Sequence, residues 1–255
     1  MYIAQVSISL PKGKNRAEAL EQAEHLINCW VQNGQVLECD YYQIKRDFGV
    51  EVIAPVPERT ALQRPNWNKS AQAQLEKLEK FGPVQIKMRI LGRDPDLRVT
   101  CKHRSPNSYI LFTTFAHYDS SLCCGDCFLP VPLYRIRKLE NDAITGVLHW
   151  GNQYRACDTL QIQCGWGERF GLMQMDSLNS GLNKEGLDVC KELKQVTRKP
   201  VYYFLHRYVK HPNRKREAER LCPGCDGKWR LNKAWHGRFN FRCDKCELIS
   251  IQPDW

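Results

Sequence analysis

Four cysteines near the C-terminus have the residue type and the spacing of a metal site. Two residues separate Cys222 from Cys225 and Cys243 from Cys246, and 17 residues lie between the two pairs. Two intervening residues let a tight turn aim both thiolates of a pair at one ion, and a gap of this size is typical of four-cysteine zinc sites. The pattern predicts a zinc ribbon in which four thiolates hold one structural Zn²⁺.

The predicted role of this metal is architectural. A catalytic zinc keeps one coordination position open for water or substrate, whereas four thiolates complete the tetrahedron. A segment of about 25 residues builds little hydrophobic core, so zinc binding should supply the free energy that folds it. Between the cysteine pairs, residues 228–233 and 239–242 are expected to form the two arms of a hairpin, with His236-Gly237 near its turn.

A second C-x-x-C pair, Cys124 and Cys127, has no matching cysteine pair nearby. A cysteine and a histidine lie upstream at a spacing that a zinc site tolerates, which gives a candidate second metal site made of Cys101, His103, Cys124 and Cys127. Cys157 or Cys164 could replace either upstream ligand. Two other interpretations stay open: plain buried thiols, and a redox pair of thioredoxin type, which needs a helix to begin at its first cysteine.

The positive charge of the chain gathers in the same C-terminal region. The formal net charge is +10, and residues 206–255 hold 12 Lys and Arg against 6 Asp and Glu. Cations interleaved with aromatic rings suit nucleic acid, because cations neutralise phosphates and rings stack on bases. The candidate nucleic-acid-binding residues are Lys228, Arg230, Lys233, Trp235, Arg238 and Arg242. Trp235 is the expected base-stacking ring, and at least half of the four aromatic residues in this segment are expected to form its small core or to dock it onto the body.

The remaining composition excludes several classes of protein. No apolar run is long enough for a membrane span. Residues 1–7 lack the basic and apolar regions of a signal peptide, so we expect a cytoplasmic protein without a membrane partner. The sequence contains no Walker loop, H-E-x-x-H or G-x-S-x-G motif. We therefore expect neither enzymatic activity nor a small-molecule substrate.

Apolar periodicity predicts an α+β fold. Alternating apolar residues predict strands over 2–10 and 84–91, and shorter apolar runs predict strands at 36–42, 50–53, 109–115 and 201–205. Apolar residues at helical spacing predict helices at 17–31, 70–81, 154–164 and 183–196. The first of these is expected to begin at Asn15 as its cap. The expected organisation is an α+β body over 1–205, a basic linker over 206–220 and a zinc ribbon over 221–255.

Several short motifs resemble those of a bacterial family of uncharacterised zinc-ribbon-containing proteins described as candidate nucleic-acid binders. The motifs are Cys124-Gly125-Asp126-Cys127 followed by Val131-Pro132-Leu133-Tyr134, then Tyr154-Arg155-Ala156-Cys157-Asp158, Val201-Tyr202-Tyr203 and the terminal cysteines. The resemblance covers nearly the whole chain and implies a zinc-bound C-terminus. The doubled cysteine motif is also similar to bacterial proteins suspected of neutralising toxins.

Two functions from different classes therefore remain at this stage. The first is a protein that binds DNA or RNA through its basic C-terminal region. The second is a protein-interaction module, such as an immunity or adaptor protein, whose partner surface lies on the α+β body. Zinc ribbons occur in both classes, so the fold alone does not choose between them.

Overall fold

The structure, a computed structural model, describes residues 1–13, 15–37, 41–136 and 141–253, and it has the mixed α+β fold that the sequence predicts. Contacts within the chain group it into two compact units. Unit 1 comprises Met1–Thr100, Tyr118–Ser120 and Pro130–Leu148. Unit 2 comprises Cys101–His117, Ser121–Leu129 and His149–Trp255. The expected division was 1–205, 206–220 and 221–255. The observed grouping instead has a boundary near residue 100, and it places the C-terminal cysteines in the same unit as residues 149–205.

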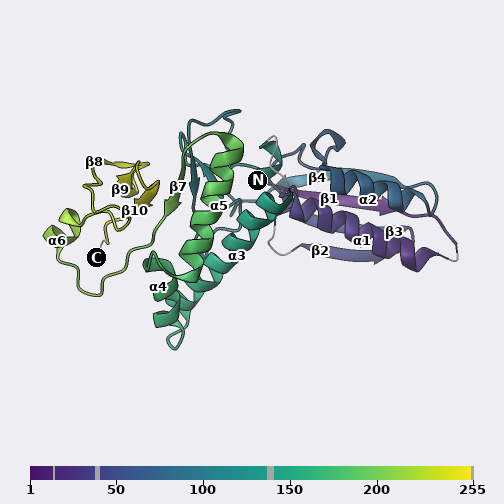
Figure 1. Ribbon diagram of the computed structural model, residues 1–255. Coiled ribbons are helices and arrows are strands. Elements are labelled where there is room, and N and C mark those ends of the chain that lie inside the picture. Colours follow the sequence, from purple (N-terminus) through teal and green to yellow (C-terminus); the bar gives the residue numbers. More distant parts are fainter. Residues whose placement is uncertain (14, 38–40, 137–140, 254–255) are drawn as a thin grey trace. The chain divides into compact units, whose positions relative to one another are not determined.

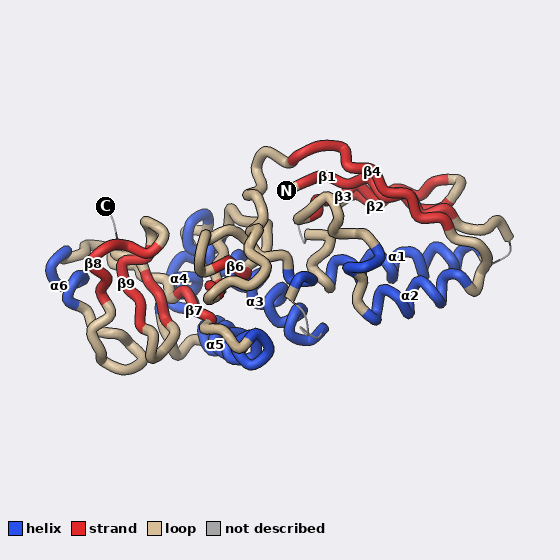
Figure 2. The backbone as a smooth tube through the Cα atoms, turned by 90° about the horizontal axis from the view of Figure 1, so that it is seen from above, coloured by secondary structure: helices blue, strands red, loops and turns tan. Residues whose placement is uncertain are grey.

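Unit 1 is built on a four-stranded antiparallel sheet with two helices. In chain order its elements are β1 (Tyr2–Ser9), α1 (Arg16–Gln32), β2 (Tyr42–Arg46), β3 (Gly49–Val56), α2 (Lys69–Glu79) and β4 (Gln85–Arg93), with the short 3₁₀ helix η1 (Arg64–Asn66) before α2. The strand order is β2-β3-β1-β4, the arrangement of a ferredoxin-like β-α-β-β-α-β unit. Both helices lie on the same face of the sheet (Figures 1 and 2).

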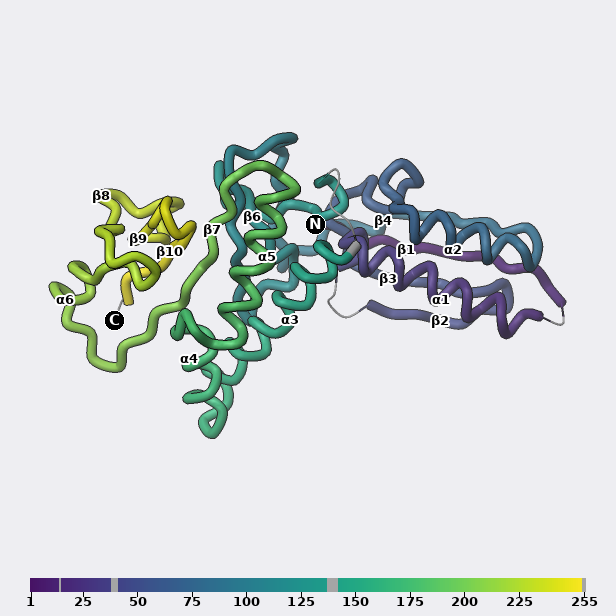
Figure 3. Tube along the Cα trace, viewed as in Figure 1, coloured from purple at the N-terminus to yellow at the C-terminus, as the bar shows by residue number. Residues whose placement is uncertain are grey.

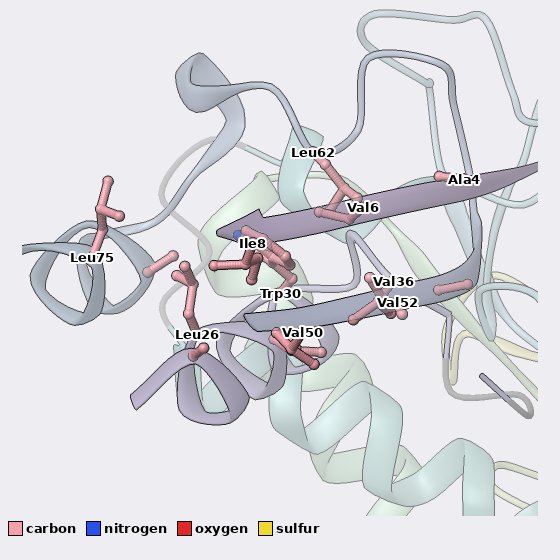
Figure 4. Close-up of a cluster of buried hydrophobic side chains, with 14 of the residues drawn as sticks. Ala4, Val6, Ile8, Leu26, Trp30, Val36, Val50, Val52, Leu62 and Leu75 are labelled. Carbon is pink, nitrogen blue, oxygen red and sulfur yellow. The ribbon is translucent and has the colours of Figure 1, made fainter. Parts of the chain in front are cut away.

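The core of unit 1 follows from the alternation in β1. Ala4, Val6 and Ile8 are buried on the helix-facing side, as the period-2 pattern predicts. Figure 4 shows Val6 and Ile8 above Trp30 of α1, whose ring centroid lies 5.3 Å from that of Trp67. The sheet and its helices are therefore held by one apolar layer.

Two details of unit 1 differ from the sequence prediction. Asn15 occupies the N-cap of α1, but its side chain makes no capping hydrogen bond. The strand expected over 36–42 includes residues 38–40, which lie outside the described residues, and the observed strand β2 begins at Tyr42. Strand formation there depends on pairing with β3, a long-range contact that the local apolar run does not reveal.

Unit 2 contains a six-stranded mixed sheet in the order β6-β5-β7-β10-β9-β8. The strands are β5 (Tyr109–Leu111), β6 (Leu122–Cys124), β7 (Val201–Phe204), β8 (Arg230–Trp235), β9 (Phe239–Cys243) and β10 (Leu248–Ser250). The central strand β7 pairs in parallel with both β5 and β10. The C-terminal strands β8–β10 are therefore part of the same sheet as β5 and β6, which is why unit 2 includes them.

The helices complete the description of the chain. They are α3 (Asn141–Gln163), α4 (Glu168–Asp176), α5 (Gly181–Thr197) and α6 (Arg214–Glu219), with the 3₁₀ helix η2 (Leu133–Arg135) before α3. Figure 3 follows the chain from β7 through a long connection into α6 and back as β8–β10. Helix α3 extends well before the predicted 154–164. Helix α4 was not predicted, because Phe170 and Met173 on it are exposed and produce no inward apolar stripe.

Gly186 allows α5 to approach β7 closely. A Cβ atom at this position would meet the ring of Tyr203 and would lie 2.5 Å from Nε1 of Trp150. We expect Gly186→Ala to lower the free energy of unfolding of unit 2 by ~1–3 kcal/mol, because overpacking displaces the helix. Urea unfolding monitored by tryptophan fluorescence measures this change.

Gly181→Ala is the matched control on the same helix. The nearest atom to its added Cβ, Oε1 of Gln174, would be 3.8 Å away. This variant should unfold like the unmodified protein, and equal losses of stability in both variants would contradict the packing argument.

Candidate metal centres and basic surface

The four C-terminal cysteines converge on one point in the structure. The Sγ atoms of Cys222, Cys225, Cys243 and Cys246 all lie within 4.8 Å of one another. The Sγ atoms of Cys225 and Cys243 are 3.6 Å apart, far longer than a disulfide bond of about 2.0 Å. Sulfurs at about 2.3 Å from a tetrahedral metal ion would be about 3.8 Å apart. The group could therefore hold a metal ion, and we call it the ribbon centre.

Tight turns aim these sulfurs inward. The N–H of Cys222 donates to the carbonyl of Gly227 (2.9 Å), and the N–H of Asp226 donates to the carbonyl of Cys222 (2.8 Å). A Cβ at Gly224 would lie 2.9 Å from Sγ of Cys246, so the glycine is needed for space. Close approach of the two cysteine turns is therefore the reason for a glycine at this position.

Burial of the Cys222 thiol affects the charge state of the ribbon centre. Burial raises the pKa of Cys222 to about 11, so its thiol is protonated at neutral pH unless a positive charge stabilises the thiolate. Binding of a metal ion supplies that charge and releases the proton. Four sulfur donors that surround one point at these distances could hold a metal ion.

A second group of ligand atoms lies at the opposite edge of the sheet of unit 2, where β6 is the last strand. It comprises Cys101, His103, Cys124 and Cys127, whose ligand atoms all lie within 4.8 Å of one another. Nδ1 of His103 is 3.4 Å from Sγ of Cys101 and 3.6 Å from Sγ of Cys124. A sulfur and a nitrogen bound to one tetrahedral zinc would be about 3.6 Å apart. We call this group the β6 centre.

The structure also bears on the alternatives for this second group. Cys157 and Cys164, the other candidate ligands, do not belong to it. Strand β6 ends at Cys124 and a turn follows, so no helix begins there. A cysteine pair of thioredoxin type would need such a helix to lower the pKa of its first thiol.

The candidate nucleic-acid-binding residues fall into two sets. Lys228, Arg230, Lys233 and Arg238 are exposed. Trp235 is half-buried, because its ring packs on Tyr202 with centroids 5.2 Å apart.

Arg242 belongs to the same packed group as Trp235. Its guanidinium lies 4.7 Å from the centroid of the Trp235 ring, and its Nε donates to Asp244 at 2.6 Å. Trp235 and Arg242 therefore serve the packing of the hairpin. The other three aromatic residues of the segment are buried and form its core: Trp229, Phe239 and Phe241.

Sequence reasoning missed the surface beside these cations. Three hollows lie along the chain from Lys210 past α6 to Asn232 on β8, and neighbouring hollows have lining residues in common. The first shares Asn213 with the second, and the second shares Glu219, Arg220 and Leu221 with the third. We call the surface that they line the basic track. Its exposed cations are Lys210, Lys215, Arg216, Lys228 and Arg230. The basic run over 206–220 was the only sequence signal for it.

An ion-pair network builds the wall of the basic track. Glu217 of α6 is buried and accepts two hydrogen bonds from Arg207, at 3.0 and 2.8 Å. Arg220 lies over the rings of Trp229 and Phe241, 4.8 and 4.0 Å from their centroids. Arg207 and Arg220 therefore stabilise the fold. Because Glu217 lies on α6, its ion pair with Arg207 fixes this helix in place, and α6 is not a free linker.

Comparison with known proteins identifies relatives of the whole chain. Residues 1–92, 103–206 and 212–253 match three families, each described as a domain of unknown function (DUF8589, DUF2310 and DUF8594). An uncharacterized protein of Haemophilus influenzae is 30% identical over 257 residues, which cover 98% of this chain and 97% of the relative. A second uncharacterized protein of Haemophilus influenzae is 31% identical over 171 residues, covering 67% of this chain and 84% of the relative.

The chain belongs to the same bacterial family as these Haemophilus proteins. No solved structure matches it. Among the described helices, none combines the length and the apolar character needed to cross a membrane.

Removing one ligand should disable the ribbon centre. We expect Cys243→Ser to lose the metal of this centre and to make residues 220–250 sensitive to protease, because three ligands no longer offset the cost of ordering the turns. Metal analysis and limited proteolysis with mass spectrometry measure both effects. Lys245→Ser, an exposed neighbour in the same turn, should change neither. Unaltered protease resistance in Cys243→Ser would show that metal is not what folds this segment.

Proposed function

We propose that this protein is a cytoplasmic zinc-ribbon protein that binds nucleic acid, DNA or RNA, through its C-terminal region. The observation that carries the proposal is the basic track beside the ribbon centre. Zn²⁺ is the metal of choice for the ribbon centre, since four thiolates in a closed tetrahedral group are typical of structural zinc. In this proposal the zinc holds the cations in place and takes no part in chemistry.

The charge balance of the surface supports a polyanionic partner. Within the described residues no ion pair engages Lys228, Arg230 or Lys233, whereas Arg207 and Arg242 are paired with carboxylates. Unpaired exposed cations are available to phosphates, and their neutralisation releases counterions from nucleic acid. Hollows lined by such cations also give phosphates places to sit close to the protein.

The mode of binding differs from the one that the sequence suggested. Trp235 is packed against Tyr202, so base stacking on it requires a rearrangement of the hairpin. Leu221 is half exposed and lines the same hollow as Lys228 and Arg230, so this hollow also offers apolar surface. We therefore place the nucleic acid along the basic track, with phosphates on the cations.

A salt series tests this proposal. Labelled single- and double-stranded DNA and RNA should bind the zinc-loaded protein with affinity that falls steeply with salt. The double variant Lys228→Glu/Arg230→Glu should reduce the slope of log affinity against log salt by about 1–2, because one or two phosphate contacts are lost. Fluorescence anisotropy at several salt concentrations measures both quantities.

Lys87→Glu/Arg89→Glu is the matched control, because it changes the net charge equally on exposed residues of β4 in unit 1. This control should bind like the unmodified protein, and both variants should retain their zinc. Failure of the unmodified protein to bind any of the four probes at low salt would refute the proposal. Equal weakening by both variants would assign binding to net charge and not to the track.

One observation favours the second candidate function, a protein-interaction module. Four large apolar side chains at the end of α3, in the turn after it and on α4 are exposed by 51–89%: Ile162, Trp166, Phe170 and Met173. Phe170 and Met173 share one face of α4, because their positions are three residues apart. We call these four side chains of unit 2 the row. Exposed apolar clusters of this kind mark protein–protein contacts.

The two candidates separate in a binding experiment with Trp166→Ser/Phe170→Ser. If the row binds a protein, a partner that co-purifies with the unmodified chain should be lost by this variant, and the purified partner should bind the two proteins with affinities differing at least ~100-fold, as for interface hot spots. Nucleic-acid binding should be unchanged in this variant. A variant that keeps every partner would exclude the row as the interface.

A further inference from the structure

We propose that the β6 centre binds a second Zn²⁺, and that this bound ion holds the tip of the C-terminal hairpin in place. The inference goes beyond the proposed function and does not depend on nucleic acid. It rests on the backbone of the β6 centre, on the geometry of its ligands and on two contacts with the hairpin. All of these features lie within unit 2.

The backbone around Cys124 repeats the backbone around Cys222. In both segments the N–H of the first cysteine donates to the carbonyl five residues later at 2.9 Å. In both, the N–H four residues after that cysteine donates back to its carbonyl at 2.8 Å. The segment 124–129 therefore has the same hydrogen-bonded turn as the segment 222–227 of the ribbon centre.

All three C-x-x-C motifs, the one at the β6 centre and the two at the ribbon centre, share a rare backbone conformation. The residue directly after the second cysteine has a positive φ in each: Phe128 (+58°), Asp226 (+56°) and Glu247 (+52°). Positive φ is uncommon for residues other than glycine and needs support from the surrounding structure. In the two ribbon turns this conformation directs both thiolates at one point. Its presence at Phe128 indicates that the β6 turn serves the same purpose.

Backbone hydrogen bonds to sulfur support thiolates at the β6 centre. The N–H of His103 donates to Sγ of Cys101 (3.3 Å), and the N–H of Asp126 donates to Sγ of Cys124 (3.4 Å). The ribbon centre has the same kind of bond, from the N–H of Cys246 to Sγ of Cys243 (3.4 Å). Such bonds stabilise metal-bound thiolates and orient them. Three thiolates and one imidazole then form a closed tetrahedral set of the structural zinc type.

Two further contacts tie the ligand-bearing segments together. The carboxylate of Asp126 accepts hydrogen bonds from the backbone N–H and the side-chain amide of Asn107, at 2.9 and 3.0 Å. The N–H of Gly125 donates to the carbonyl of Ser108 (2.8 Å), and a Cβ at Gly125 would collide with the Ser108 side chain. These contacts join the segment that carries Cys101 and His103 to the β6 turn.

The hairpin tip rests on this turn. His236 and Gly237 both have positive φ, +54° and +67°, which makes the tip a type I′ turn. Nε2 of His236 donates to the carbonyl of Gly125 at 2.8 Å. The His236 ring also stacks on Phe128, with centroids 5.4 Å apart and an interplanar angle of 17°.

Loss of the metal therefore has an effect beyond its own ligands. Gly125 lies between the two cysteines of the β6 turn, and Phe128 follows the second. Without zinc, four clustered thiol and imidazole groups lose the interaction that draws them together, and the turn relaxes. The tip then loses both its hydrogen bond and its stacking partner, although the ribbon centre keeps its four cysteines.

Zinc content tests the first half of the inference. Protein loaded with excess zinc and then desalted should hold two zinc ions per chain by mass spectrometry of the metal. Cys124→Ser/Cys127→Ser should hold one, and Cys164→Ser, a half-buried cysteine outside both centres, should hold two. One zinc per unmodified chain would overturn the inference, as would two zinc ions in the double variant.

Cobalt covers the case in which the double variant does not fold. Metal-stripped, reduced unmodified protein is titrated with Co²⁺ alone. The ligand-field and sulfur-to-cobalt absorption of tetrahedral sites should saturate at two equivalents. Saturation at one equivalent would overturn the second site without use of a variant.

Hydrogen exchange tests the second half. In the zinc-loaded double variant, the amides of residues 234–238 should exchange at least ~10-fold faster than in the unmodified protein, since local opening sets their rate. The turn at 222–227 should remain protected. His236→Ala should accelerate exchange at the tip by a similar factor while it retains two zinc ions. Unchanged tip exchange in the double variant would refute the holding role of the ion, whatever His236→Ala does.

Discussion

The arrangement of unit 2 depends on the pairing of one short strand. All four residues of β7, Val201–Phe204, are buried, and this strand pairs in parallel with β5 on one side and β10 on the other. Parallel neighbours need long connections, because the chain must return to the same end of the sheet. Two distant parts of the sequence, each carrying one cysteine group, are brought to the same sheet by this strand.

Aromatic packing turns that pairing into a stable core. The ring of Phe112, which follows β5, lies 5.0 Å from Phe204 at the end of β7 and 5.8 Å from Phe239 at the start of β9. Phe128 lies 5.2 Å from Phe112 and 5.1 Å from Phe239. Edge-to-face and tilted contacts of this kind stabilise a core beyond the burial of apolar area. The aromatic cluster therefore packs the β6 turn against the hairpin.

The charges of the C-terminal region divide between the fold and the surface. Arg207, Arg220 and Arg242 contact carboxylates or aromatic rings and help to build unit 2. Such partly buried pairs place each cation at a defined position. Lys228 and Arg230 remain outside this network. A net positive charge in a sequence therefore does not identify a binding surface. The structure must first distinguish cations that stabilise the fold from cations that remain exposed.

Local spacing was enough to determine several features of this protein. The ribbon centre was predictable because two C-x-x-C pairs leave few other geometries for four thiols. The strand β1 and the helices α1, α2 and α5 were predictable because their buried residues recur at strand or helix period. The mixed α+β class followed from these elements.

Only the tertiary structure decided the rest. The pairing of β7 with β10 makes the C-terminal strands part of unit 2, and a pairing between residues 40 or more positions apart leaves no local pattern. The ligands of the β6 centre come from two segments, so the sequence offered several combinations and the fold selected one. The packing of Trp235 on Tyr202 gave a structural role to a residue that composition alone assigned to binding. In each case the deciding contact joins residues that are far apart in the sequence. Sequence spacing carries information only about residues that are close to one another in the chain.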